Sequence, residues 1–289
     1  MPATALAFLL SSCNRGILDP VGPVGAAEKQ ILINSTAIML AIVIPTMIAT
    51  VAIAFWFRRG NKKATYRPDW EYSGAIEMVV WAIPALTIML LGGITWIGSH
   101  DLEPSKPLPS KSAPLKVDVV SLDWKWLFIY PDQRIAAVNQ LVVPAGTPVS
   151  FRLTSATVMN SFFVPQLGSQ IYTMAGMATN LNLQADKPGK FPGLSAQFSG
   201  DGFADMRFTV TAVPAGDFDS WVEKVRGTGD ALDDSGYGEL TKPSRAVPPA
   251  TYRSVDPELF RRIVDQTALN PEKARAGSAW CPPAQQAGG

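Results

Sequence analysis

The chain has 289 residues, of which 47% are hydrophobic, and its formal net charge is +1. The near-zero charge, and the lack of a basic run that could serve as a phosphate footprint, argue against a nucleic-acid partner. Two cysteines, Cys13 and Cys281, are too few for a disulfide framework, and the single histidine, His100, argues against a Ser-His-Asp triad and a histidine-rich metal site.

The N-terminal segment, residues 1–13, contains an apolar run that ends in small residues and a cysteine, ALAFLLSSC. This order is typical of the hydrophobic region and cleavage site of a secretory signal peptide. The letters LSSC also resemble the lipobox of bacterial lipoproteins, in which the cysteine carries the lipid, so Cys13 is the predicted lipidation site. The alternative is a free or buried cysteine in a short hydrophobic tail. A lipidated Cys13 excludes a disulfide bond with Cys281.

Two long apolar segments follow, and each predicts a transmembrane helix, at residues 31–57 and 75–98. The first carries no charged residue, and the second carries none from Met78 onward. About 20 apolar residues are enough for a helix to span a bilayer, and a soluble helix of this length would show a polar stripe. Pro45 and Pro84 lie inside the segments, which membrane helices tolerate. We therefore expect a hairpin of two helices in the lipid bilayer.

The link between these helices, residues 58–74, is short and basic. It contains Arg58, Arg59, Lys62, Lys63 and Arg67 against Asp69 and Glu71. Short loops with an excess of Lys and Arg stay in the cytoplasm. The N-terminus and everything after His100 are therefore predicted to lie on the periplasmic side of a bacterial inner membrane.

Residues 115–213 predict an all-β domain, after a linker rich in Pro, Ser and Lys. Segments such as VSFRLT alternate apolar and polar residues, and turn signals such as VPAGTP separate them. This pattern is typical of a β-sandwich or barrel. The segment LDWKWLFIY is predicted to place four aromatic side chains on one face of a strand: Trp124, Trp126, Phe128 and Tyr130. Such a face packs in a core or contacts a partner protein, and the two uses are compatible.

The remainder of the chain predicts a helical C-terminal extension over residues 214–265. The segments DFDSWVEKV and DPELFRRIVDQ each begin with an aspartate that suits a helix N-cap, and both have helical apolar spacing. Residues 266–289 are rich in Gly, Ala and Pro, and we expect a disordered tail there.

This layout resembles subunit II of the haem-copper terminal oxidases. LDWKWLFIYP is similar to the aromatic strand of that family, and MNSFFVPQLGSQIYTMAGM is similar to the segment that leads to its metal site. LEPSKPL and DWKWLFIYP together are similar to the quinol-oxidising branch, the bo-type ubiquinol oxidases. The resemblance covers about residues 10–260. It implies a transmembrane hairpin of two helices, a cupredoxin-like β-sandwich or barrel, and a helical C-terminal extension.

The stretch SAQFSGDGFADM is similar to the copper loop of the cytochrome c-oxidising branch, where cysteines, histidines, a methionine and a glutamate carbonyl hold a binuclear copper site. Soft sulfur ligands favour Cu(I) there. The resemblance places the ligand positions at Asn160, Ser195, Gln197, Ser199, Phe203 and Met206. Only Met206 keeps its ligand type, and Met206 alone cannot hold a metal. The resemblance therefore implies a domain without copper, in which Met206 packs in the core.

The resemblance further implies that this chain has no catalytic or cofactor-binding residue of its own and serves an oxidase that reduces oxygen to water and pumps protons. Ubiquinol would deliver electrons to the large subunit I, which would hold the haems and one copper, and the smaller membrane subunits III and IV would complete the complex. By the same resemblance Glu77 would collect cytoplasmic protons for the K-pathway. The alternative is that Glu77 only stabilises the N-terminus of its helix.

Two competing interpretations remain open. A cytochrome c oxidase subunit II is disfavoured because the cysteine and histidine ligands are missing. A free-standing membrane lipoprotein with a metal-free cupredoxin-like binding domain is disfavoured by the two membrane spans and by Glu77, because such a receptor needs only its lipid anchor.

Overall fold

The computed structural model describes residues 16–65, 67–110 and 112–269. The chain divides into two compact units, of which one comprises Ala27–Glu103 and the other comprises the residues on both sides of it. The predicted signal peptide with Cys13, and residues 270–289 of the predicted disordered tail, lie outside the described residues.

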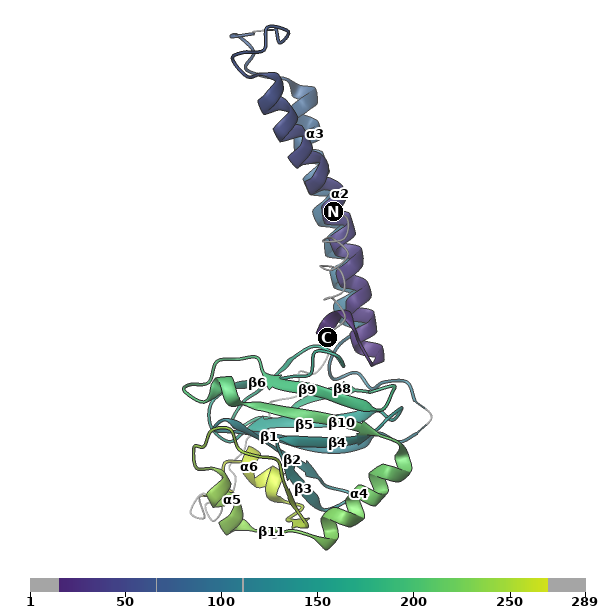
Figure 1. Cartoon of the computed structure of the whole chain (residues 1–289), viewed down its shortest axis with the longest axis vertical. Coiled ribbons are helices and arrows are strands. Elements are labelled where there is room, and N and C mark those ends of the chain that lie inside the picture. The colour runs from purple at the N-terminus through teal and green to yellow at the C-terminus, as the bar shows by residue number, and fades with distance from the viewer. Residues whose placement is uncertain (1–15, 66, 111, 270–289) are drawn as a thin grey trace, which may run out of the picture. The chain divides into compact units, whose positions relative to one another are not determined.

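The smaller unit is a hairpin of two long helices, drawn side by side in Figure 1. The helices are α2 (Pro23–Trp56) and α3 (Gly74–Asp101). Both are long and apolar enough to cross a membrane, by length and composition. Pro45 and Pro84 lie inside them. Next to Pro45, the Thr46 hydroxyl donates a hydrogen bond of 2.8 Å to the carbonyl of Ile42, one turn earlier in the same helix.

The two helices approach closely at Gly98. A Cβ atom added there would lie 2.7 Å from Cδ1 of Ile31 on the other helix. Small residues at a helix interface allow such an approach in membranes, where van der Waals packing drives association.

The larger unit is a sandwich of two β-sheets (Figure 1). The six-stranded sheet has the order β12-β3-β2-β1-β5-β8, and the five-stranded sheet has the order β4-β10-β9-β6-β7. The strands are β1 (Leu115–Leu122), β2 (Lys125–Tyr130), β3 (Ile135–Val138), β4 (Gln140–Pro144), β5 (Val149–Ser155), β6 (Asn160–Phe163), β7 (Ile171–Thr173), β8 (Thr179–Leu183), β9 (Gly189–Ser195), β10 (Arg207–Val213) and β12 (Ala250–Tyr252).

Strand β2 is buried on both faces. Trp126, Phe128 and Tyr130 point into the core between the two sheets. Leu127 and Ile129, which alternate with them, point into a second core on the outer face of the six-stranded sheet. An uninterrupted apolar run such as WLFIY is what burial on both faces requires.

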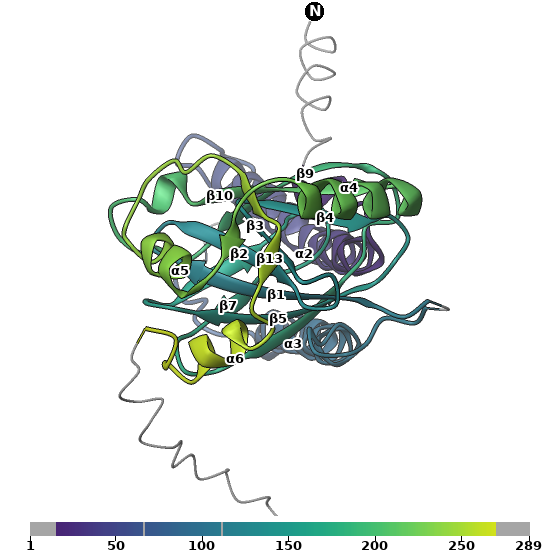
Figure 2. The same ribbon diagram turned by 90° about the horizontal axis from the view of Figure 1, so that it is seen from below.

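The C-terminal extension covers this outer face. Its secondary structure differs from the predicted helical extension. It contains three helices, α4 (Ala215–Gly227), α5 (Asp234–Leu240) and α6 (Leu259–Val264), but also the short strands β11 (Ala231–Leu232) and β13 (Ser254–Val255) and the edge strand β12. Because β12 pairs antiparallel with β3, the extension is part of the six-stranded sheet. Figure 2 shows α5, α6 and β13 lying across that sheet.

The start of the predicted disordered tail is packed. The Thr267 amide donates to the carbonyl of Arg262 at 2.8 Å, and the Ala268 amide donates to the same carbonyl at 3.1 Å. Ala268 also packs against the second core. The prediction of disorder is therefore wrong for these residues, because they close the last helix against the sheet.

Two buried polar side chains hold the extension: Lys125 of β2, and Asn139 between β3 and β4. Lys125, only 2% exposed, donates from Nζ to the carbonyl of Lys242 at 2.8 Å. Burial lowers the pKa of Lys125. Asn139 donates from Nδ2 to the carbonyl of Val247 at 2.8 Å. Both bonds satisfy carbonyls of an irregular segment that would otherwise lose hydrogen bonds on burial.

The residues just before α2 are bound to the same domain, after the 3-10 turn η2 (Gly16–Leu18). The Val21 amide donates to the carbonyl of Gln166 at 2.8 Å, and the Asp186 amide donates to the carbonyl of Val21 at 2.8 Å. Gly22 has no room for a side chain, because a Cβ atom would lie 2.0 Å from the carbonyl oxygen of Gln184.

Candidate functional site

The loop that connects β9 to β10, residues 196–206, lies beside the first residues of β6. β9 pairs antiparallel with β10 and with β6, and Phe162 is opposite Ser195. The Ala196 amide donates to the carbonyl of Ser161 at 3.0 Å. This pairing brings Asn160, at the start of β6, next to Ser195, at the end of β9.

Ser195 and Asn160 are joined directly. The Ser195 hydroxyl donates to Oδ1 of Asn160 at 3.1 Å, with a second contact to the carbonyl of Gln197 at 3.3 Å. The Asn160 amide nitrogen donates to the carbonyl of Val158 at 3.2 Å. Ser195 is 2% exposed and Asn160 is 1% exposed, so the pair forms a closed, buried polar contact.

Met206 packs in the core between the sheets and is 1% exposed. Its backbone carbonyl accepts a hydrogen bond of 3.2 Å from the Ser195 amide. The predicted packing role of Met206 agrees with this position, since a thioether fills irregular gaps in a core.

The remaining positions of the loop point in different directions. Phe203 lies in the turn η3 (Phe203–Asp205), and its ring meets that of Phe198 edge-on at 5.7 Å. The Ser199 carbonyl accepts a hydrogen bond of 3.0 Å from Nε1 of Trp124. The Ser199 hydroxyl is buried and has no hydrogen-bond partner among the described residues. Gln197 is half-buried.

The donor chemistry at these positions does not fit a copper centre. Serine offers a hydroxyl, which is a poor ligand for Cu(I); asparagine offers an amide that is already hydrogen-bonded; and phenylalanine offers no donor atom. The structure thus brings Asn160, Ser195 and Met206 together around the end of β9, and the arrangement stabilises the loop through hydrogen bonds and packing.

The family of the chain follows from comparison with known proteins. Residues 117–213 match the family model described as the periplasmic domain of cytochrome c oxidase subunit II, and residues 226–268 match the COX aromatic rich motif. Subunit 2 of the cytochrome bo(3) ubiquinol oxidase of Pseudomonas putida is 51% identical over 259 residues, covering 90% of this chain and 82% of the relative. The chain belongs to this family of bo(3) oxidase subunits 2.

Two further relatives agree with this assignment. Subunit 2 of the cytochrome bo(3) ubiquinol oxidase of Pseudomonas aeruginosa is 49% identical, covering 90% of this chain and 78% of the relative. The ubiquinol oxidase subunit 2 of Acetobacter aceti is 48% identical, covering 89% of this chain and 84% of the relative. The predicted fold class is confirmed: α2 and α3 are transmembrane helices, and a cupredoxin-like domain and C-terminal helices follow.

The aromatic strand of this chain has a different role from the predicted partner contact. Trp126, Phe128 and Tyr130 are all 0% exposed, and the Tyr130 hydroxyl donates to the carbonyl of Val142 at 2.9 Å. Partner contact through these three side chains is therefore wrong, because the second sheet covers them. Trp124 does not share their face: it precedes β2, and its backbone has a φ of +64°.

Glu77 lies in the first turn of α3 and is exposed. Its amide donates to the carbonyl of Ser73 at 3.0 Å, and the Ser73 side chain makes no capping hydrogen bond. A carboxylate in this turn is stabilised by the helix dipole. The position suits both interpretations of Glu77, and its role in proton uptake stays a prediction. Cys13 lies outside the described residues.

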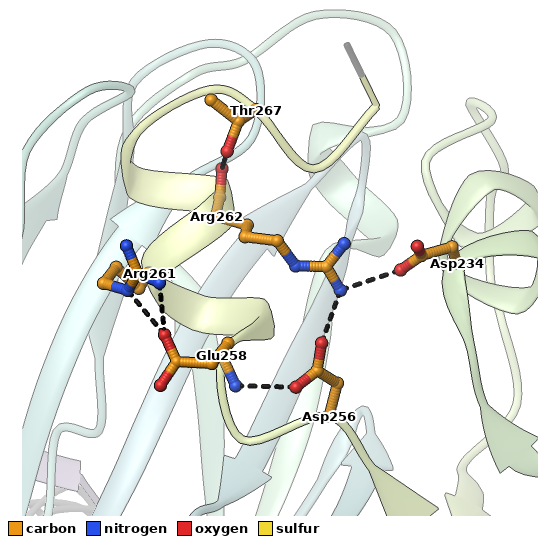
Figure 3. A network of polar contacts seen from close by, with 6 residues as sticks. All are labelled: Asp234, Asp256, Glu258, Arg261, Arg262 and Thr267. Carbon is orange, nitrogen blue, oxygen red and sulfur yellow. Dashed lines mark hydrogen bonds and ion pairs between the residues drawn. The ribbon is translucent and has the colours of Figure 1, made fainter. Parts of the chain in front are cut away.

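The polar contacts within the C-terminal extension were not predicted from the sequence. Arg262 donates from Nη2 to Asp234 at 2.8 Å and to Asp256 at 2.7 Å, and Arg261 forms an ion pair with Glu258 (Figure 3). The leading aspartate and the apolar spacing of DPELFRRIVDQ predicted a helix, but they could not indicate the contact with Asp234, which lies on α5 earlier in the chain.

An ion pair between two strands of the six-stranded sheet also contacts the extension. Arg152 donates from Nε and Nη2 to the carboxylate of Asp118, both at 2.7 Å, and its guanidinium lies 4.9 Å from the ring centre of Phe260 on α6. Asp118 is 2% exposed. A buried carboxylate needs such a bidentate partner, since an unpaired buried charge is costly.

Proposed function

We propose that this chain is the subunit II of a respiratory ubiquinol oxidase that reduces oxygen to water and pumps protons, and that the chain itself carries no redox centre. The observation that carries the proposal is the buried hydrogen bond between Ser195 and Asn160. These are positions at which the resemblance expects a thiolate and an imidazole, and a hydroxyl bound to an amide offers neither. Electrons would therefore enter from ubiquinol at the partner subunit.

The partners would be the large subunit I, with the haems and one copper, and the smaller membrane subunits III and IV. The names of the relatives support an oxidase complex with ubiquinol as its substrate. Helices α2 and α3 would pack on subunit I within the bilayer, since their side chains are largely exposed in the isolated chain. The basic link between them supports a cytoplasmic loop and a periplasmic β-domain.

Two further roles belong to the same proposal. Glu77, in the first turn of α3, would collect protons at the cytoplasmic edge of the membrane, because the resemblance to the oxidase family gives this role to a glutamate at this position. Cys13 would carry the lipid that anchors the N-terminus. The C-terminal extension would serve as a structural part of the periplasmic domain, together with the sheet that it completes.

Oxygen uptake and copper content of the purified complex test the proposal. We expect the complex, isolated through a tag on this chain, to consume oxygen with ubiquinol and not with reduced cytochrome c, and to contain one copper ion. Met206→Leu should leave the copper content unchanged, because Met206 would hold no metal. Uptake driven by cytochrome c, or additional copper that Met206→Leu removes, would contradict the proposal; so would a chain that purifies without a haem-bearing partner.

A further inference from the structure

Trp124 adopts a backbone conformation that is unfavourable for its residue type. It stands in the turn between β1 and β2 with a φ of +64°. Glycine or asparagine is the usual choice for a left-handed residue in a turn, and a bulky side chain there is an outlier. Such a conformation persists only where the surroundings stabilise it. The contacts of the Trp124 side chain must therefore offset the strain in the turn.

The ring of Trp124 lies against the backbone of the loop between β9 and β10. Its Nε1 donates to the carbonyl of Ser199 at 3.0 Å. A Cβ atom at Gly202 would lie 2.3 Å from Cδ2 of the ring, and one at Gly200 would lie 3.4 Å from Cζ2. Gly202 thus leaves the space in which the ring contacts the loop backbone directly, whereas Gly200 has a φ of +104°, which favours glycine.

The C-terminal extension contacts the same ring through Arg245. The Arg245 guanidinium lies 5.6 Å from the ring centre of Trp124 and forms an ion pair of 3.2 Å with Asp201 of the loop. Both partners of this ion pair are largely exposed, so the ion pair alone is weak. Arg245 of the extension contacts both Trp124 in the turn and Asp201 in the loop, and these contacts together join the three segments.

The segment that carries Arg245 is itself held to the sheet. Lys125, the neighbour of Trp124, donates to the carbonyl of Lys242, and Asn139 donates to the carbonyl of Val247. Arg245 therefore projects from a stretch that is fixed on both sides. A guanidinium presented from a fixed segment loses less entropy when it stacks on an aromatic ring.

In a metal-bearing loop of this kind, bonds to the metal tie the loop to the neighbouring strands. Here the hydrogen bond between Ser195 and Asn160 ties only the start of the loop. We propose that Trp124, held by Arg245 of the extension, replaces the metal as the cross-link for the rest of the loop, Ser199–Gly202. Trp124 then stabilises the loop, and the extension is required for the loop conformation. This inference rests on one part of the proposed function, namely that the loop carries no copper.

Hydrogen exchange of the intact, purified oxidase complex, read by mass spectrometry on loop peptides from residues 196–206, tests the cross-link. Arg245→Ala removes an exposed side chain and should speed exchange in the loop by about two- to fivefold. Trp124→Gly removes the ring and relieves the strained turn, and it should speed exchange on the order of tenfold. Trp124→Phe, which keeps a ring but loses the bond to Ser199, should lie between wild type and Trp124→Gly.

Arg261→Ala is the matched control, because Arg261 is an exposed arginine of the extension whose ion pair does not involve the loop. It should leave loop exchange unchanged. Wild-type exchange in Trp124→Gly and Arg245→Ala would overturn the cross-link. Copper analysis of the same samples separates the two proposals: additional copper bound by this chain would refute the metal-free loop, whereas unchanged exchange without such copper would refute only the cross-link.

Discussion

The hydroxyl of Ser195 donates a hydrogen bond of 3.1 Å to the side-chain oxygen of Asn160, and both residues are buried. The two residues belong to different strands, β9 and β6, which meet at the loop between β9 and β10. The contact satisfies a buried polar pair without any ion. Substitution of either residue can therefore measure how much this hydrogen bond contributes to the free energy of unfolding.

Ser195→Ala should lower the free energy of unfolding by about 1–3 kcal/mol, because Oδ1 of Asn160 is then buried without its donor. The double variant Ser195→Ala/Asn160→Ala should cost less than the sum of the two single variants, since no unpaired group remains. Denaturant unfolding of the full chain in detergent measures both. Ser220→Ala, on an exposed face of α4, is the control and should change the stability by less than about 0.5 kcal/mol. Additive single effects would contradict the pairing.

Gly22→Ala should detach the segment that precedes α2. The new Cβ would meet a backbone oxygen, that of Gln184, which cannot rotate away. We expect a loss of about 1–3 kcal/mol and faster hydrogen exchange at the amides of Val21 and Asp186. Gly216→Ala is the matched control, because nothing lies within 4 Å of its Cβ. It sits in a helix and should be neutral or stabilising. Equal effects of the two changes would exclude a steric cause.

Arg262→Gln should loosen the extension, because it removes the charged hydrogen bonds to Asp234 and Asp256. The arginine side chain is 25% exposed, so we expect a cost of about 1–2 kcal/mol. Faster hydrogen exchange in α5 and α6 would report it. Arg261→Gln, whose side chain is 68% exposed, is the control. An equal effect of Arg261→Gln would show that the Arg262 contacts contribute nothing specific.

The same contacts predict a pH dependence. The hydrogen bond from Arg262 holds the pKa of Asp234 below its usual 3.8. A carboxyl whose pKa is lowered on folding contributes stability above its unfolded pKa, and this stability is lost as the pH falls through the folded value. Acid should therefore loosen α5 in the wild-type protein below about pH 4. The loss should be small, because Asp234 is largely exposed, and it should be smaller still in Asp234→Asn.

Glu77→Ala should slow ubiquinol-driven turnover severalfold without changing the amount of assembled complex, if Glu77 collects protons at the end of α3. Glu77→Gln keeps the size of the side chain and should be equally slow, because an amide cannot take up a proton. Glu71→Ala, which changes an exposed carboxylate of the link before α3, is the control. Wild-type turnover and proton uptake in Glu77→Gln would leave only the helix-dipole role.

The local pattern of the sequence was enough to predict the main elements. Charge-free segments around Pro45 and Pro84 predicted two membrane helices, since length and apolarity alone decide whether a helix can span a bilayer. Alternation in segments such as VSFRLT predicted strands, which the structure has in β5. Where apolar residues recur at a regular period, the local sequence is enough to predict the helix or strand.

The role of the aromatic strand could not be read from the sequence. WLFIY is also compatible with a strand that has one exposed face. The outer face of β2, which carries Lys125, is buried only by the extension, more than a hundred residues later in the chain. The backbone of Trp124 likewise depends on Gly202 and Arg245, which come from two other segments. Strands in the extension escaped prediction because β12 depends on its partner β3 for its hydrogen bonds.

Local apolarity, periodicity and spacing were enough to specify the two membrane helices, the β-rich domain and the residue types at the loop. The hydrogen bond from Ser195 to Asn160, the burial of β2 on both faces, and the place of Trp124 between the loop and the extension became known from the folded chain alone. Each of these contacts joins residues that are distant in the chain, and their pairing depends on how the sheets and the extension pack together.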